Sequence, residues 1–153
     1  MKTLALAIGH GPKIDKGAEN AKSGTTELGY NRDLADRIAA NLRGRMQVFI
    51  IHRGKEKIPP VVAINATKAD IAIELHCNAF NGKATGTEMI HHPGSRKGIR
   101  LAELLQDAAV GALKLLDRGV KPPQGGRGSA ILKGTKMPFI HDEERFGPLG
   151  EPL

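Results

Sequence analysis

The chain has 153 residues, a length typical of one domain, and its 40% hydrophobic and 25% charged residues argue against a disordered chain. Lys and Arg outnumber Asp and Glu by 23 to 16, and the formal net charge of +7 favours polyanionic partners such as nucleic acid, anionic lipid or cell-wall polymer. Five aromatic residues exclude aromatic stacking as the main mode of ligand binding, and one cysteine excludes a disulfide within the chain.

The first half of the chain alternates apolar runs with polar segments. Thr3–Ile8 is an apolar run that predicts a buried strand, and the glycine-containing stretch of residues 13–24 predicts a loop. Either Thr25 or Thr26 can cap a helix from Glu27 to Leu42, because apolar residues recur there at helical spacing. The next predicted elements are the strand 47–52, a proline-initiated helix over 60–68 and the strand 70–77.

The second half continues this alternation. Residues 86–91 predict a strand, and Ser95 is the expected cap of a helix whose periodic segment is 100–116. Residues 119–128, rich in glycine and proline, predict a loop. We expect short strands at Ile131–Leu132 and Phe139–Ile140, and a tail over 147–153. The predicted fold class is α/β: a single domain over residues 1–153 with a mostly parallel, twisted sheet flanked by helices.

Histidines lie at or just after the predicted strand ends, where ligand sites of parallel sheets gather. His76 shares one face of its strand with Glu74 and Asn78, while Cys77 faces the apolar side, so His76 is a candidate site residue. His91 and His92 point to opposite faces and are better interpreted as an exposed strand end.

The polar segments also form a recognisable series of motifs. The matching segments, in chain order, are Gly9-His10-Gly11, Asp15-Lys16-Gly17-Ala18, Glu27 with Asn31, Ile51-His52-Arg53, residues 74–79, Gly86-Thr87-Glu88, residues 118–121, and Met137-Pro138 followed by Glu143 and Phe146. Their order and spacing resemble the zinc-dependent N-acetylmuramoyl-L-alanine amidases of the family called amidase 3. The resemblance extends over residues 3–146.

The resemblance implies a function and a set of site residues. The metal ligands would be His10, Glu27 and His76, which would hold one Zn²⁺ per chain, and the catalytic carboxylate would be Glu143. The implied reaction is hydrolysis of the amide bond between N-acetylmuramic acid and L-alanine in peptidoglycan. A nearby cation, Arg53 or Arg145, could stabilise the oxyanion.

The chain also departs from the family pattern. Glu74 stands where the family usually has serine, and a carboxylate there could orient His76 or compete with the base. The family is apolar and glycine-rich around the catalytic carboxylate, whereas this chain has His141, Asp142 and Glu144 there. Glu144 is therefore a rival candidate for the base. The expected cleft residues are Asn78, Glu74, Arg53 and Arg145.

The sequence shows no export signal and no apolar run long enough for a membrane span. We therefore expect a phage endolysin that is made in the host cytoplasm and acts on the cell wall, as a monomer, after release. A bacterial autolysin or remodelling amidase is the alternative of the same class. From other classes, a basic nucleic-acid-binding protein and a metal-free wall-binding module are the alternatives, although scattered basic residues do not favour nucleic acid.

Overall fold

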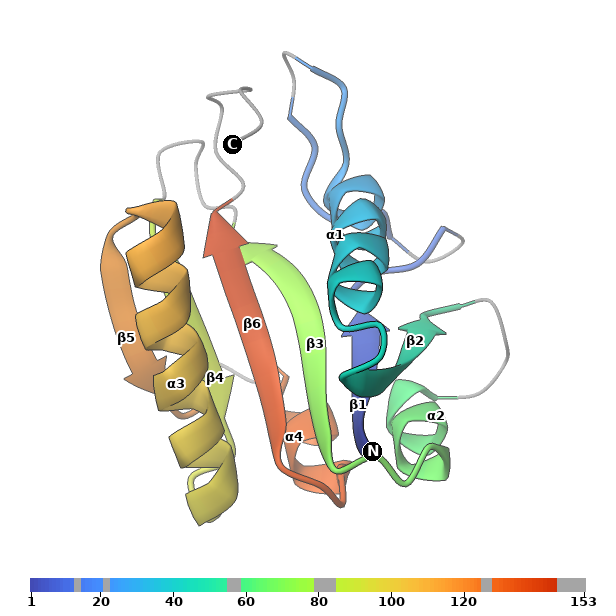
Figure 1. Cartoon of the computed structure of the whole chain (residues 1–153). Helices are drawn as coiled ribbons and strands as arrows, with labels where there is room; N and C mark the ends of the chain where they lie inside the picture. Colours follow the sequence, from blue (N-terminus) through green and yellow to red (C-terminus); the bar gives the residue numbers. More distant parts are fainter. Residues whose placement is uncertain (13–14, 21–22, 55–58, 79–84, 125–127, 146–153) are drawn as a thin grey trace.

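The computed structural model in Figure 1 describes residues 1–12, 15–20, 23–54, 59–78, 85–124 and 128–145. In these residues, strands form one sheet in the order β2-β1-β3-β6-β4-β5. Their bounds are β1 (Lys2–Ile8), β2 (Met46–His52), β3 (Ile71–Asn78), β4 (Thr87–His91), β5 (Asp117–Lys121) and β6 (Phe139–Arg145). All neighbouring pairs are parallel except β4 and β6. The predicted α/β domain with a mostly parallel sheet is confirmed.

Helices cover both faces of this sheet. Their bounds are α1 (Glu27–Asn41), α2 (Pro60–Ala66), α3 (Arg96–Leu113) and α4 (Ser129–Gly134). On β1, Leu4, Leu6 and Ile8 pack towards α1, whereas Ala5 and Ala7 belong to the cluster that contains residues of α2 and α4. Because strand side chains alternate between faces, α1 lies on one face and the short helices α2 and α4 lie on the other. α3 covers the face that Ile140 presents on the β4 side of the sheet. Among the described helices, none is long and apolar enough to span a membrane.

The helix starts follow side-chain caps. Thr26 is the N-cap of α1, where its hydroxyl accepts a hydrogen bond from the Gly29 amide. Ser95 caps α3 through the Gly98 amide, so this helix begins directly after the cap and ends at Leu113, before the predicted end at residue 116. The cap of α1 places Glu27 in the first turn, where the helix dipole favours a carboxylate.

Three expectations about the second half of the chain were wrong. Ile131 and Leu132 lie in the helix α4, because two adjacent apolar residues carry no period that separates helix from strand. Part of the predicted loop 119–128 is the edge strand β5. His91 is buried, because its strand pairs with β6 opposite Ile140. The predicted strand at Phe139–Ile140 continues to Arg145, and the expected tail 147–153 lies outside the described residues.

Asp70 connects the start of β1 to the segment before β3. Its carboxylate accepts hydrogen bonds from Lys2 Nζ at 2.7 Å and from the Thr3 amide and hydroxyl at 2.8 Å each. These contacts, chiefly the hydrogen bond from Lys2, lower the pKa of Asp70 from 3.8 to about 2. A carboxyl group whose pKa is lower in the folded state stabilises the fold while it is ionised.

We expect Asp70→Asn to lower the thermal midpoint of unfolding near neutral pH, because an amide replaces the charged acceptor of these hydrogen bonds. The difference in midpoint between the two proteins should shrink as the pH falls from about 4 towards about 2, where the wild-type carboxylate becomes protonated. Calorimetry of both proteins across this range measures the difference. A difference that does not change with pH would contradict the assigned role of the Asp70 charge.

Candidate functional site

A pocket of about 650 Å³ lies at the carboxyl ends of β1, β3 and β6. Its lining comes from β3, β6, the segments after β1 and β2, the start of α1, and α4. Parallel neighbours end at the same edge of the sheet, which is why residues distant in sequence meet here. His10, Glu27, Glu74, His76, His141 and Glu143 all line this pocket.

His10, Glu27 and His76 converge on one point of the pocket. Oε1 of Glu27 lies 3.1 Å from Nε2 of His10 and 3.1 Å from Nδ1 of His76. The two imidazole rings are 4.9 Å apart between centroids and inclined at 69°. The backbone of His10 has a φ of 62°, a left-handed conformation that is uncommon outside glycine. Such uncommon conformations are often found at functional sites, and His10 lines the pocket.

The backbone around the pocket fixes the Glu27 carboxylate. Oε1 accepts a hydrogen bond from the Cys77 amide at 2.8 Å, and Oε2 accepts one from the Ala18 amide at 3.1 Å. Burial alone would raise the pKa of Glu27, but hydrogen bonds from His76, Cys77 and Ala18 outweigh it and hold that pKa below its usual value. Glu27 is therefore a buried carboxylate that remains charged.

Asp15 orients His10. Its Oδ2 lies 3.1 Å from Nδ1 of His10, and its Oδ1 accepts a hydrogen bond from the Gly17 amide. The second ring nitrogen of His10 therefore faces Glu27, and carboxylate partners of this kind orient metal-binding histidines in many proteins. Asp15 was not among the predicted site residues, although it belongs to the motif of residues 15–18.

The geometry of His10, Glu27 and His76 fits a divalent metal ion such as zinc. Ligand atoms about 2.0–2.2 Å from a tetrahedral zinc ion lie roughly 3.3–3.6 Å from one another, slightly more than the 3.1 Å that separates Oε1 of Glu27 from Nε2 of His10 and from Nδ1 of His76. His76 gives a second indication. Burial would lower its pKa, but the neighbouring carboxylates of Glu27 and Glu74 outweigh burial and raise the pKa of His76 to about 9. The surroundings thus favour a positive charge at this place.

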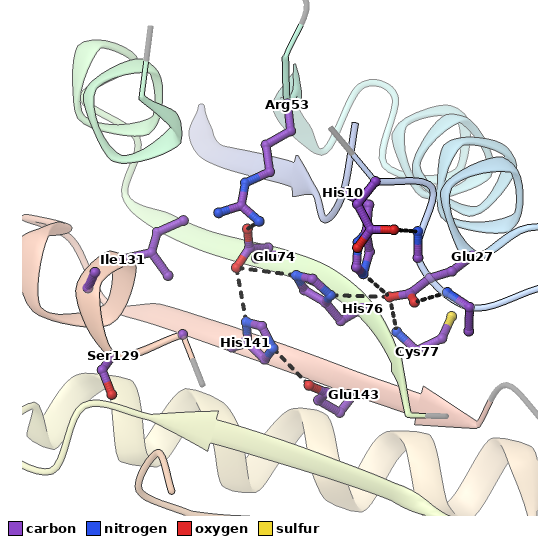
Figure 2. Close-up of a pocket in the computed structure, with 15 residues that line it drawn as sticks. His10, Glu27, Arg53, Glu74, His76, Cys77, Ser129, Ile131, His141 and Glu143 are labelled. Atoms are coloured by element: carbon purple, nitrogen blue, oxygen red, sulfur yellow. Dashed lines mark hydrogen bonds and ion pairs between the residues drawn. The ribbon is translucent and has the colours of Figure 1, made fainter. Parts of the chain in front are cut away.

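A second group of buried side chains adjoins the first. Oε2 of Glu74 lies 2.9 Å from Nδ1 of His141 and 3.7 Å from Nε2 of His76, and Nε2 of His141 lies 3.0 Å from Oε1 of Glu143 (Figure 2). Burial opposes the charges in this group. Hydrogen bonds, mainly from His141, nevertheless hold the pKa of Glu74 far below its usual value, and those to Glu143 and Glu74 raise the pKa of His141.

The structure places the predicted cleft residues as follows. Glu74 is buried in the pocket wall, and Nη1 of Arg53 lies 4.0 Å from its Oε1. The backbones of Asn78, Glu144 and Arg145 belong to β3 and β6, but their side chains lie outside the described residues. The Cys77 side chain is buried 3.6 Å from the Asn31 amide oxygen of α1, so its predicted position in the core is confirmed.

His141 and the α4 residues Ser129 and Ile131 line the pocket but were not among the predicted site residues. In the sequence His141 stood out only as a departure from the family pattern beside Glu143, and Ser129 and Ile131 gave no signal of a site. The signal that could have found His141 is its spacing of two from Glu143, which puts both on one face of a strand.

A family comparison covers nearly the same residues as the motif series. The model of the family Amidase_3, described as N-acetylmuramoyl-L-alanine amidase, matches residues 4–146. The chain belongs to this family. An uncharacterized cell wall amidase of Bacillus anthracis is 33% identical over 87 residues, which is 52% of this chain and 16% of that protein. This chain therefore spans about a sixth of the length of that relative.

Solved structures of amidases share the fold. The catalytic domain of CwlV, an N-acetylmuramoyl-L-alanine amidase from Bacillus (Paenibacillus) polymyxa, superposes with a TM-score of 0.78 at 21% identity, covering 94% of this chain and 79% of that one. The catalytic domain of an endolysin targeting Clostridia difficile has a TM-score of 0.73 at 24% identity, covering 93% and 80%.

Gly9 supports the site by the absence of a side chain. The imidazole of His76 packs directly over its Cα, so a Cβ built on Gly9 would overlap that ring. The backbone of Gly9 is also held in place, because its amide donates to the Leu75 carbonyl. Neither partner of this contact has room to move without disturbing the pocket.

We expect Gly9→Ala to destabilise the protein by roughly 1–3 kcal/mol, the usual cost of overpacking, through displacement of His76. Gly111→Ala is the matched control. Gly111 lies in α3 with no neighbouring atom within 4 Å of an added Cβ, so this change should stabilise the protein by up to about 1 kcal/mol. Denaturant unfolding measures both. Equal effects in both variants would show that the predicted overlap with His76 is absent.

Proposed function

We propose that residues 1–153 form a catalytic domain that hydrolyses the amide bond between N-acetylmuramic acid and L-alanine in peptidoglycan, with one zinc ion. The observation that carries this proposal is the convergence of His10, Glu27 and His76 in a pocket that Glu143 also lines. Membership of the amidase family supports the substrate. The proposed oligomeric state is a monomer.

We assign the metal-holding role to Nε2 of His10, Oε1 of Glu27 and Nδ1 of His76. Two neutral imidazoles and one carboxylate are a donor set typical of catalytic zinc, which keeps a further position open. A zinc ion held by these three residues would supply Lewis-acid chemistry: it would polarise the scissile carbonyl and lower the pKa of the attacking water towards neutrality. Asp15, bonded to the other ring nitrogen of His10, keeps Nε2 of that ring towards the ion.

Glu143 is the proposed general base and acid. It lies on β6 opposite His76 of β3, and both line the pocket. Its carboxylate takes a proton from the attacking water as the carbon–oxygen bond forms, and delivers that proton to the leaving nitrogen as the carbon–nitrogen bond breaks. Arg53 at the pocket wall, with Arg145, is the proposed source of positive charge for the oxyanion. Asn78 and Glu74 are proposed to complete the cleft.

Removing a ligand should remove the metal. We expect His10→Ala, Glu27→Ala and His76→Ala each to lose most of the bound zinc, because two protein ligands remain where catalytic zinc sites ordinarily have three. Elemental analysis of purified protein measures zinc per chain, and a value near one is expected before mutation. His92→Ala, outside this pocket, is the control and should keep its zinc. Full zinc content in Glu27→Ala would refute the assignment of Glu27 as a ligand. If the wild-type protein bound no zinc, the result would favour the metal-free wall-binding module or the nucleic-acid-binding protein.

Removing the base should leave the metal in place. Glu143→Gln is expected to retain zinc but to lose turnover of a soluble muropeptide by about 10²–10⁴-fold, because an amide of the same shape cannot accept the proton. Glu144→Gln is the matched comparison and should change turnover much less. If Glu144→Gln proved the more damaging change, the base would be Glu144.

Within this function we propose the phage endolysin role, with host-cytoplasmic synthesis and action on the wall after release. A bacterial autolysin or remodelling amidase is the second candidate, since the catalytic domain of CwlV and that of the endolysin both share the fold, with TM-scores of 0.78 and 0.73. The two roles differ in the need for activation. An endolysin added to permeabilised cells should lyse intact walls without any partner, whereas a remodelling amidase that depends on an activator should cleave only soluble fragments.

A further inference from the structure

Two strands of the pocket carry complementary sequences. On β3 the order is Glu74, Leu75, His76, and on β6 it is His141, Asp142, Glu143. The strands are parallel and in register, so that Glu74 lies opposite His141 and His76 lies opposite Glu143. Residues two apart in a strand share a face, so Glu74, His76, His141 and Glu143 lie together on one face of the sheet. In this block each carboxylate lies opposite an imidazole of the neighbouring strand.

The contacts within this block form a chain. Oε2 of Glu74 lies 2.9 Å from Nδ1 of His141, and Oε1 of Glu143 lies 3.0 Å from Nε2 of His141, both within hydrogen-bond distance. The His141 ring also stacks on the His76 ring, at 4.3 Å between centroids and 24° between planes. Both nitrogens of His141 thus face carboxylates, and one carboxylate of the chain adjoins a proposed metal ligand while the other is the proposed base.

The stability of the fold is a poor explanation for these charged side chains, because they are buried. Glu74, His141 and Glu143 are 1%, 4% and 7% exposed. Oε1 of Glu74 has no hydrogen-bond partner among the described residues, and the Arg53 guanidinium lies 4.0 Å from it. A buried ionic group of this kind contributes little net stability compared with apolar side chains of the same volume, because desolvation offsets the attraction. An arrangement that is costly to bury and lies against a reactive site is more readily explained by a role in that site.

We infer that Glu74 and His141 are positioning residues: together they hold the Glu143 carboxylate and the His76 ring in a fixed mutual orientation. This inference rests on the proposed function, since it takes Glu143 as the base and His76 as a ligand. The inference also gives one explanation for two departures from the family pattern. Glu74 and His141, neither of which is usual at its position in the family, are hydrogen-bond partners of each other. Neither residue touches the substrate in this role; each acts through its neighbour.

Glu74, His76 and His141 could alternatively hold a metal ion of their own, since their ligand atoms lie within 4.8 Å of one another. The separations favour hydrogen bonding. The 2.9 Å between Glu74 and His141 is a hydrogen-bond distance, and the 3.7 Å between Glu74 and His76 is unequal to it. In the trio of His10, Glu27 and His76, by contrast, Oε1 of Glu27 is equally distant, at 3.1 Å, from Nε2 of His10 and from Nδ1 of His76.

The first test concerns the base. His141→Leu removes both hydrogen bonds, and we expect kcat on a soluble muropeptide to fall about 10–100-fold with KM and zinc content nearly unchanged. His141→Gln keeps an N–H that can reach Glu143, so it should recover part of the lost kcat. Asp142→Asn is the matched control, since Asp142 is buried on the same strand but points to the other face. Each variant is measured with saturating zinc, well below its own melting temperature.

The second test concerns the ligand and does not need activity. Glu74→Gln removes the charge beside His76, and competition with a chelator should show zinc affinity about 10–100-fold lower. A crystal structure of His141→Leu should show the Glu143 carboxylate moved from its present position. These two measurements decide the inference even if the unchanged protein cleaves no muropeptide, a result that would reject the proposed function instead.

Four outcomes would overturn the inference. The first is an unchanged kcat per zinc-loaded chain in His141→Leu, and the second is an equal loss of kcat in His141→Leu and His141→Gln. The third is an unmoved Glu143 carboxylate in His141→Leu together with unchanged zinc affinity in Glu74→Gln. The fourth is a content of two zinc ions per chain that falls to one in His141→Leu. The last result would assign Glu74, His76 and His141 to a second metal site.

Discussion

The site depends on one buried carboxylate that connects its own helix to two other parts of the chain. Glu27, in the first turn of α1, accepts hydrogen bonds from the Ala18 and Cys77 amides and faces the rings of His10 and His76. Without these partners, burial would favour its neutral form. The loop after β1, the start of α1 and the end of β3 are therefore held in one arrangement by the need to satisfy a single charge.

The division of the sheet into two faces explains why the site is polar on one side only. At the end of β3, Leu75 and Cys77 face α1 and complete the core, while Glu74 and His76 face the pocket. The same alternation on β6 separates Ile140, which packs towards α3, from His141 and Glu143. On β3, strand periodicity thus lets a buried central strand carry charged groups on one face and apolar groups on the other, whereas β6 also buries Asp142 on the face of Ile140.

Much of this could be predicted from the sequence, because the strongest signals are local. Apolar runs located β1, β2 and β3, and the threonine cap located the start of α1. The motif series grouped His10, Glu27 and His76, which the structure brings together. The pairing of Glu74 with His141 could not be predicted, because it depends on the register of two strands separated by 67 positions in sequence. α4 was missed because its six residues are too few to show a helical period.

The position of β6 in the sheet has a consequence for the order of assembly during translation. β6 follows every other strand in the chain, yet it lies between β3 and β4 and pairs with both. A nascent polypeptide that ends before residue 139 therefore has two open strand edges where the centre of the sheet will be. It also lacks both His141 and Glu143. The proposed metal ligands are synthesised before β6, but the proposed catalytic site is complete only once β6 has been inserted between β3 and β4, and until then the exposed strand edges are prone to aggregation.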